Sequence, residues 1–214
     1  MSKPRTSLIW ALLALALPAA AAELDFAPTR TVDGRSFAIT GAGVRRDGGD
    51  GQYEMALYVD ELDARRAFPA LVTRAGGKTR QKLLAGDHAQ QFLLWGHFGK
   101  LAELRFLAPL SAEALRAQVK QGLDEELGDK ASPELRQQEA TLLEVFDSDV
   151  APGQTLLVRT DDAGHIELEL AGHRKSGPQS PKLARALWGV WLGAKPTSKE
   201  LSRALVDKVD LLGR

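Results

Sequence analysis

The sequence contains no cysteine, so disulfide bonds and thiolate metal ligands are unavailable to it. Histidine is scarce as well, with residues at positions 88, 97, 165 and 173 only. None of these positions has the spacing of a known zinc motif, and we expect neither a metal site nor a cofactor. A chain of 214 residues is long enough to bury its own core, so packing must hold the fold together.

Excess charge of one sign is also lacking. The formal net charge is zero, and leaving out Lys3 and Arg5 reduces the 28 basic residues to 26 against 28 acidic ones, a net charge of −2. No long run of either sign occurs. This balance argues against nucleic acid or an anionic membrane surface as the partner.

Long apolar runs are confined to the N-terminus. Lys3 and Arg5 precede the apolar run Leu8–Leu17, and the small residues Ala20-Ala21-Ala22 end it. This order is typical of a cleavable secretory signal, and the run is too short for a bilayer, which needs about 20 residues. We expect a signal peptide over residues 1–22 with cleavage near Ala22-Glu23, and a single domain over residues 23–214. The mature protein would then be periplasmic or secreted, with no integral membrane segment.

Motifs for nucleotide or nucleophile chemistry are missing too. Gly41 and Gly43 lack the third glycine of a dinucleotide fingerprint, because Arg46 stands in its place, and a strand follows where a helix should start. No phosphate loop or GxSxG elbow occurs. The two glycines instead indicate that a strand bends here or that a ligand approaches its backbone.

What the sequence does contain is a strand, a glycine-rich turn and a second strand over Ser36–Asp60. Side chains alternate between the two faces of a strand. The residues expected to share an apolar face are Phe37, Ile39 and Arg45 in the first strand, and Tyr53, Met55, Leu57 and Val59 in the second. If the turn Arg46–Gln52 closes a hairpin, Arg45 and Tyr53 lie opposite each other on this apolar side.

Serine caps followed by apolar residues at helical spacing predict most of the helices. The expected starts are Ser111, Ser132-Pro133, Ser180-Pro181 and a capping box of Thr197 with Glu200, which opens a last helix reaching Leu212. A short helix over Glu61–Phe68 should stop at Pro69.

Strands are expected at Phe92–Trp95, at Ala102–Leu107 and in a hairpin from Leu156 to Leu170, and His173–Gln179 is expected to be a loop. Hairpins imply antiparallel pairing, and the strands and helices cluster rather than alternate. The sequence therefore predicts an α+β fold, an antiparallel sheet with helices on one face.

An arginine on an apolar face has two interpretations. A guanidinium keeps its proton and is costly to remove from water unless an anion meets its donors, so Arg45 with Tyr53 could hold a ligand carboxylate. Alternatively, Arg45 pairs with Asp47, Asp50 or another carboxylate of the chain. The large aromatics Trp188 and Trp191 are expected to anchor the core.

Four stretches resemble the chalcone isomerase superfamily, and in particular its bacterial, exported chalcone-isomerase-like members. They are GAGVRR followed by QYEMALYVDE, then AELRFLAPLSAEALRAQVKQGLDEEL, LEVFDSDVAPGQTLLVRTDDAGHIELEL and SPKLARALWGVWLGAKPTSKEL. The resemblance implies an open-faced β-sandwich, in which helices cover a large antiparallel sheet and leave a ligand cleft. It also implies that Arg45 holds an anionic oxygen and that Tyr53 stands where the fatty-acid-binding branch has a carboxylate-binding tyrosine.

The sequence departs from the true isomerases on the helix after Ser111. Where they carry a tyrosine, a lysine and an asparagine around the reacting groups, this chain has Leu115, Gln118 and Gly122. An addition of a phenolate to an enone needs positioned donors where charge develops, and leucine and glycine offer none. We therefore expect no catalytic residues.

The favoured hypothesis is an exported, non-catalytic protein that binds a fatty acid or similar amphipathic carboxylate. Arg45 and Tyr53 would hold the head group, and an apolar cleft would hold the tail, lined by Met55, Leu57, Leu115 and Val119. Two alternatives remain: a chalcone-type isomerase, an intramolecular lyase acting on another enone, and an envelope structural or interaction protein whose cleft is filled by its own side chains.

Overall fold

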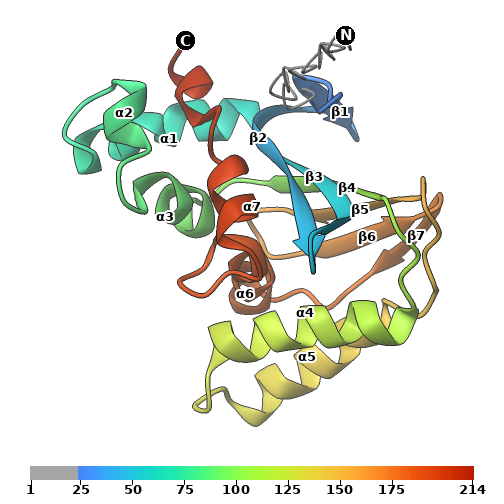
Figure 1. Ribbon diagram of the computed structural model, residues 1–214. Helices are drawn as coiled ribbons and strands as arrows, with labels where there is room; N and C mark the ends of the chain where they lie inside the picture. The colour runs from blue at the N-terminus through green and yellow to red at the C-terminus, as the bar shows by residue number, and fades with distance from the viewer. Residues whose placement is uncertain (1–23) are drawn as a thin grey trace, which may run out of the picture.

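Seven antiparallel strands form one curled sheet in which every strand pairs with its neighbours in sequence, in the order β1 to β7 (Figure 1). The structure is a computed structural model that describes residues 24–214, so the predicted signal peptide and its cleavage point lie outside the described residues. The strands are β1 (Thr29–Val32), β2 (Arg35–Asp47), β3 (Asp50–Asp60), β4 (Lys100–Phe106), β5 (Thr155–Thr160), β6 (Ile166–Leu170) and β7 (His173–Ser176).

Seven α-helices and one 3-10 helix accompany the sheet within residues 24–214. They are α1 (Glu61–Arg74), α2 (Arg80–Leu83), α3 (His88–Trp95), α4 (Ala112–Leu127), α5 (Pro133–Glu144), α6 (Pro181–Leu192), α7 (Lys199–Ala204) and η1 (Val209–Gly213). In this part of the chain no helix has the length and apolar character needed to cross a membrane. The predicted α+β class with an antiparallel sheet is confirmed.

Helix α6 is the centre of the helical layer. Nine of its twelve residues are buried, and it contacts α3, α4, α5 and α7. Figure 1 shows α4 and α5 lying beside each other and next to α6. The main core forms between this layer and one face of the sheet, where Met55, Leu57 and Trp188 are almost inaccessible to solvent. A smaller cluster with Phe26, Phe37 and Tyr58 covers the opposite face.

The serine caps predicted from sequence are confirmed. The hydroxyls of Ser111, Ser132 and Ser180 accept hydrogen bonds from the backbone N–H groups three residues later. At the last helix the cap is Ser198, one residue after the predicted Thr197, and it accepts from the N–H of Leu201. The expected long helix is also wrong, because the chain leaves α7 after Ala204 and forms η1 separately.

A β-bulge in β2 corrects the predicted faces of the opening hairpin. Ile39 pairs with Tyr58 but Gly41 pairs with Leu57, so Thr40 is an extra residue in the ladder. One inserted residue exchanges the two faces of a strand. Phe37 and Ile39 therefore face the smaller cluster, whereas Gly41, Gly43 and Arg45 face the helices. The predicted pairing of Arg45 with Tyr53 is confirmed.

Three predictions of local structure are wrong. Phe92–Trp95 belongs to α3 rather than to a strand, because four apolar residues fit either structure and buried Ala89 extends the helical spacing. Helix α1 continues through Pro69 to Arg74; Pro69 is exposed, and burial of Leu71 outweighs the lost hydrogen bond. The segment from His173 to Ser176 is not loop but edge strand β7.

The glycines of β2 leave room for the end of helix α7, and not for a ligand, to pack closely against the strand backbone. A Cβ on Gly41 would lie 2.1 Å from the carbonyl oxygen of Ala204, and one on Gly43 would lie 2.7 Å from the Ala204 Cβ. The bulged Thr40 fixes this contact, since its hydroxyl donates to the carbonyl oxygen of Leu205 at 2.9 Å. The end of α7 is thereby held directly on the bend of β2.

Candidate functional site

Arg45 and Tyr53 face each other across β2 and β3 beneath the helical layer. The half-buried Arg45 guanidinium donates from Nη1 to the carbonyl oxygen of Thr197 at 2.5 Å. Its Nε is buried and has no hydrogen-bond partner. Within residues 24–214 no carboxylate forms an ion pair with Arg45, so neither Asp47 nor Asp50 supplies the internal partner considered above. A backbone carbonyl satisfies only one of the five donor hydrogens of a guanidinium.

The phenol of Tyr53 is 4% exposed and accepts a hydrogen bond from the Trp191 indole N–H at 3.2 Å. Burial raises the pKa of Tyr53, and the hydrogen bond from Trp191 and the charge of Arg45 oppose this only in part. The phenol is therefore protonated at neutral pH. Because Trp191 is the donor in their hydrogen bond, the phenol proton remains available to an acceptor.

A small cavity of about 20 Å³ adjoins this pair. That volume holds about one water molecule. Thr197 contributes a hydroxyl whose Oγ1 is buried and has no partner. Arg45 does not line the cavity itself, but Tyr53 and Thr197, which it contacts, both do. The wall residues of this inner cavity are Tyr53, Leu104, Leu115, Gln118, Val119, Phe146, Leu156, Val158, Val190, Trp191 and Thr197.

A second and much larger hollow of about 440 Å³ lies against the same helices and sheet. Three of its wall residues, Leu115, Phe146 and Leu156, also line the inner cavity. The wall of this outer groove comprises Leu115, Val145, Phe146, Ser148, Asp149, Gln154, Leu156, Leu168, Leu170, Ala171, His173 and Lys175. Its volume is in the range typical of small-molecule sites, whereas that of the inner cavity is far below it.

The structure brings together some of the residues predicted for the site. Tyr53, Leu115 and Val119 line the inner cavity. Met55 and Leu57 lie on the same face of the sheet but are fully buried in the core, and they line neither hollow.

Sequence reasoning missed Thr197, Phe146 and the role of Trp191 beside Tyr53. The contribution of Thr197 to Arg45 comes from a backbone carbonyl, which has no signature in a sequence. Phe146 was assigned to the buried stripe of a helix, and nothing in its spacing indicated a cavity. The indole N–H of a buried tryptophan does seek a partner, which is a signal that could have been used for Trp191.

The positions that carry polar groups in the true isomerases are occupied differently here. Leu115 presents an apolar side chain to the inner cavity, and Gln118 also lines it. Gly122 lies against α6, where a Cβ would be 2.8 Å from the Val190 methyl groups. That glycine serves the close packing of α4 on α6 and offers no side chain to a reaction.

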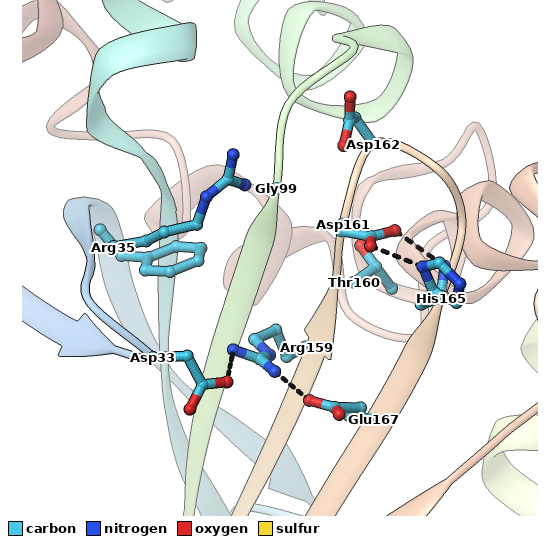
Figure 2. A pocket seen from close by; sticks show the side chains of 10 residues that line it. Asp33, Arg35, Gly99, Arg159, Thr160, Asp161, Asp162, His165 and Glu167 are labelled. Atoms are coloured by element: carbon cyan, nitrogen blue, oxygen red, sulfur yellow. Dashed lines mark hydrogen bonds and ion pairs between the residues drawn. The ribbon is translucent and has the colours of Figure 1, made fainter.

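A polar pocket of about 430 Å³ lies at one end of the sheet, and several of its charged side chains pair with one another (Figure 2). Arg159 lies between Asp33, at 2.5 Å, and Glu167. The Nδ1 of His165 is 2.6 Å from a carboxylate oxygen of Asp161, whose contact raises the pKa of the imidazole. These pairs join the turn after β1 to β5 and β6, which is a structural role.

Comparison with known proteins places this geometry in a family. The family model described as "Chalcone isomerase-like" matches residues 19–207. The chain belongs to the chalcone isomerase-like family. No match is found among the curated proteins.

A solved structure, the fatty-acid binding protein of Arabidopsis thaliana, resembles this chain with a TM-score of 0.69 at 14% sequence identity. The match covers 88% of this chain and 94% of the plant protein. At this identity the likeness shows a shared fold, which is the chalcone isomerase-like fold that the four sequence stretches implied.

Proposed function

We propose that this protein is an exported, non-catalytic binder of a fatty acid or a similar amphipathic carboxylate. The observation that carries the proposal is a set of buried donors without acceptors: Arg45 Nε, the Thr197 hydroxyl and the phenol proton of Tyr53. Buried polar groups are nearly always paired, and unpaired ones call for a missing partner. A carboxylate entering beside Tyr53 would supply acceptors to this group and a counter-charge to Arg45.

Two further facts support this proposal. The similar plant structure is that of a fatty-acid binding protein, and the outer groove offers an apolar volume next to the donors. Export to the periplasm or outside the cell is proposed from the N-terminal order of basic, apolar and small residues, which is typical of a cleavable signal.

The decisive experiment is a titration of the purified mature protein with dodecanoate, joined to native mass spectrometry for copurified acyl chains. Arg45→Ala should weaken binding about 10- to 100-fold, because a charge-assisted hydrogen bond contributes about 1.5–3 kcal/mol. Arg46→Ala is the matched control, since Arg46 is exposed and contacts only the carbonyl oxygen of Gly49. A wild-type protein that carries no lipid and does not bind dodecanoate would contradict the proposal.

One observation favours the structural alternative: the inner cavity holds only about 20 Å³. An envelope protein with a filled cleft would show the same melting temperature with and without dodecanoate. A ligand that binds only the folded state must raise that temperature.

Isomerase activity has no comparable support, because Leu115 and Gly122 supply no donor. Turnover of a chalcone panel that disappears in Arg45→Ala would reverse this judgement.

A further inference from the structure

The structure holds two hollows of very different size that share part of their walls. The inner cavity is lined by Tyr53 and Thr197, which Arg45 contacts, but it has room for about one water, and the outer groove has about 440 Å³ but is not lined by Arg45. Side chains common to both walls separate the two spaces. Those side chains are Leu115, Phe146 and Leu156.

Of these three, Phe146 is the one that lies outside a helix or a strand. Leu115 belongs to helix α4, and Leu156 belongs to a central strand. Phe146 follows the end of α5, beyond the last helical residue Glu144. Its buried phenyl ring, 4% exposed, borders the outer groove, which gives the ring space for a change of rotamer.

The backbone on both sides of Phe146 is nevertheless anchored. Lys175 of β7 donates to the carbonyl oxygen of Val145 and forms an ion pair with Asp147. These contacts hold the segment in place and leave the Phe146 ring as the movable part. An opening between the two hollows thus requires one side-chain rotation rather than a loop displacement.

We propose that the inner cavity and the outer groove are two halves of one ligand site, and that Phe146 is the plug between them. The ligand carboxylate lies at the Arg45 end, and its acyl tail displaces the Phe146 ring and lies in the outer groove between α4, β5 and β6. This inference rests on the proposed function and adds the position of the tail and the residue that controls entry.

The charges fit this orientation. Lys175 at the rim of the groove is already paired with Asp147, and Asp149 is engaged as the acceptor of the Ala112 N–H. The rim lysine is thus already paired, whereas Arg45 has a buried Nε without a partner. The interior of the groove is apolar, with Leu156, Leu168 and Leu170 in its wall.

The absence of cysteine makes a direct test possible. Ser148→Cys places a single thiol of nearly the same size in the groove wall, and Ser36→Cys places one on exposed β2 as the control. Both proteins are labelled with N-phenylmaleimide in the presence and absence of dodecanoate. At about ten times the dissociation constant, dodecanoate should slow labelling of the groove thiol roughly tenfold and leave the control unchanged.

Variants of the plug test its role. Phe146→Ala removes the ring that must rotate and should tighten dodecanoate binding about three- to tenfold, whereas Phe146→Trp should weaken it by a similar factor. Phe68→Ala is the matched control, because it removes another buried phenyl ring that lines neither hollow. It should lower stability without changing affinity.

The outcomes separate this inference from the proposed function. If dodecanoate does not bind wild-type protein at all, the proposed function fails. Suppose instead that dodecanoate binds and that Arg45→Ala weakens this binding. If labelling of the groove thiol is then not slowed, or if the Phe146 variants bind dodecanoate as the wild type does, the two-part site is wrong and the binding function stands. A loss of binding in Lys175→Ala with none in Arg45→Ala would show the opposite orientation and also overturn the inference.

Discussion

Gly41 lies so close to Ala204 that a Cβ at this strand position would be 2.1 Å from the Ala204 carbonyl oxygen. No side chain fits in that space without moving the backbone of one partner. The contact joins the first long strand to the last α-helix and so positions Thr197, on the loop before α7, above Arg45.

Gly41→Ala should therefore lower the free energy of unfolding by about 2–3 kcal/mol, the upper range for overpacking a core. Chemical denaturation measures the change. Gly99→Ala is the control, because its Cβ would meet its nearest neighbour at an ordinary 3.4 Å. Equal stability of the two variants would show that α7 can shift freely on β2.

The buried Lys100 should make the stability of the protein depend on pH in an unusual way. It is 5% exposed, its ammonium donates to the carbonyl oxygens of Gly96 and Phe98, and burial lowers its pKa to about 8. The folded state binds this proton less well than the unfolded state does. The destabilisation is thus fully present below pH 8 and disappears as the pH rises toward 10.5, the ordinary pKa of a lysine.

Lys100→Met should accordingly stabilise the protein at pH 7 by about 1–3 kcal/mol, with a gain that shrinks toward pH 10. Denaturation midpoints across this pH range give the measurement. Lys130→Met, at an exposed position, should change stability little at any pH. A gain for Lys100→Met that does not depend on pH would show that the ammonium is well solvated.

The two tyrosines of the chain should both resist ionisation. Burial raises the pKa of Tyr58 to about 12, with the nearby Glu103 carboxylate as a second cause, and burial raises that of Tyr53. An alkaline absorbance titration should show no tyrosinate near pH 10 in the folded protein, and the normal transition in denaturant. Because the folded state keeps these protons longer, their contribution to stability falls as the pH rises above 10.

A buried carboxylate lies between helices α4 and α5. Removing its charged partner should lower the free energy of unfolding. Glu139 is 3% exposed and lies 2.7 Å from the Arg136 guanidinium. Arg136→Ala should destabilise the protein by about 2–4 kcal/mol because it leaves that buried charge with only the longer contact to Lys120, at 3.8 Å. Adding Glu139→Leu should recover most of the loss, and a double-mutant cycle measures the coupling.

A surface pair provides the control for this cycle. Arg66→Ala breaks the exposed bridge to Asp63 on α1 and should cost less than about 1 kcal/mol. If Arg136→Ala costs no more than Arg66→Ala, water reaches Glu139 and the carboxylate is not effectively buried.

Local signals in the sequence predicted much of the fold. Ser111, Ser132 and Ser180 marked helix starts because capping depends on a single side chain and the next few N–H groups. The pairing of Arg45 with Tyr53 followed from alternation near a tight turn. The bulge at Thr40 could not be predicted, since its cause is a hydrogen bond to Leu205, 165 residues later.

The site was predictable to the same extent. Arg45 and Tyr53 stand out because polar groups on an apolar face are unusual. The approach of the Thr197 carbonyl and the position of Phe146 between two hollows depend on how α6, α7 and the end of α5 pack, and these are tertiary facts without a local pattern.

The hydrogen bond from Arg45 to Thr197 spans 152 residues of sequence, while Arg45 and Tyr53 are neighbours in one hairpin. Closing a loop of that length costs about 4 kcal/mol of chain entropy, which this single contact cannot offset. The proposed head-group site therefore forms only when the whole sheet and the C-terminal helices are assembled around it. A ligand held there would protect the entire domain against unfolding and proteolysis, not the opening hairpin alone.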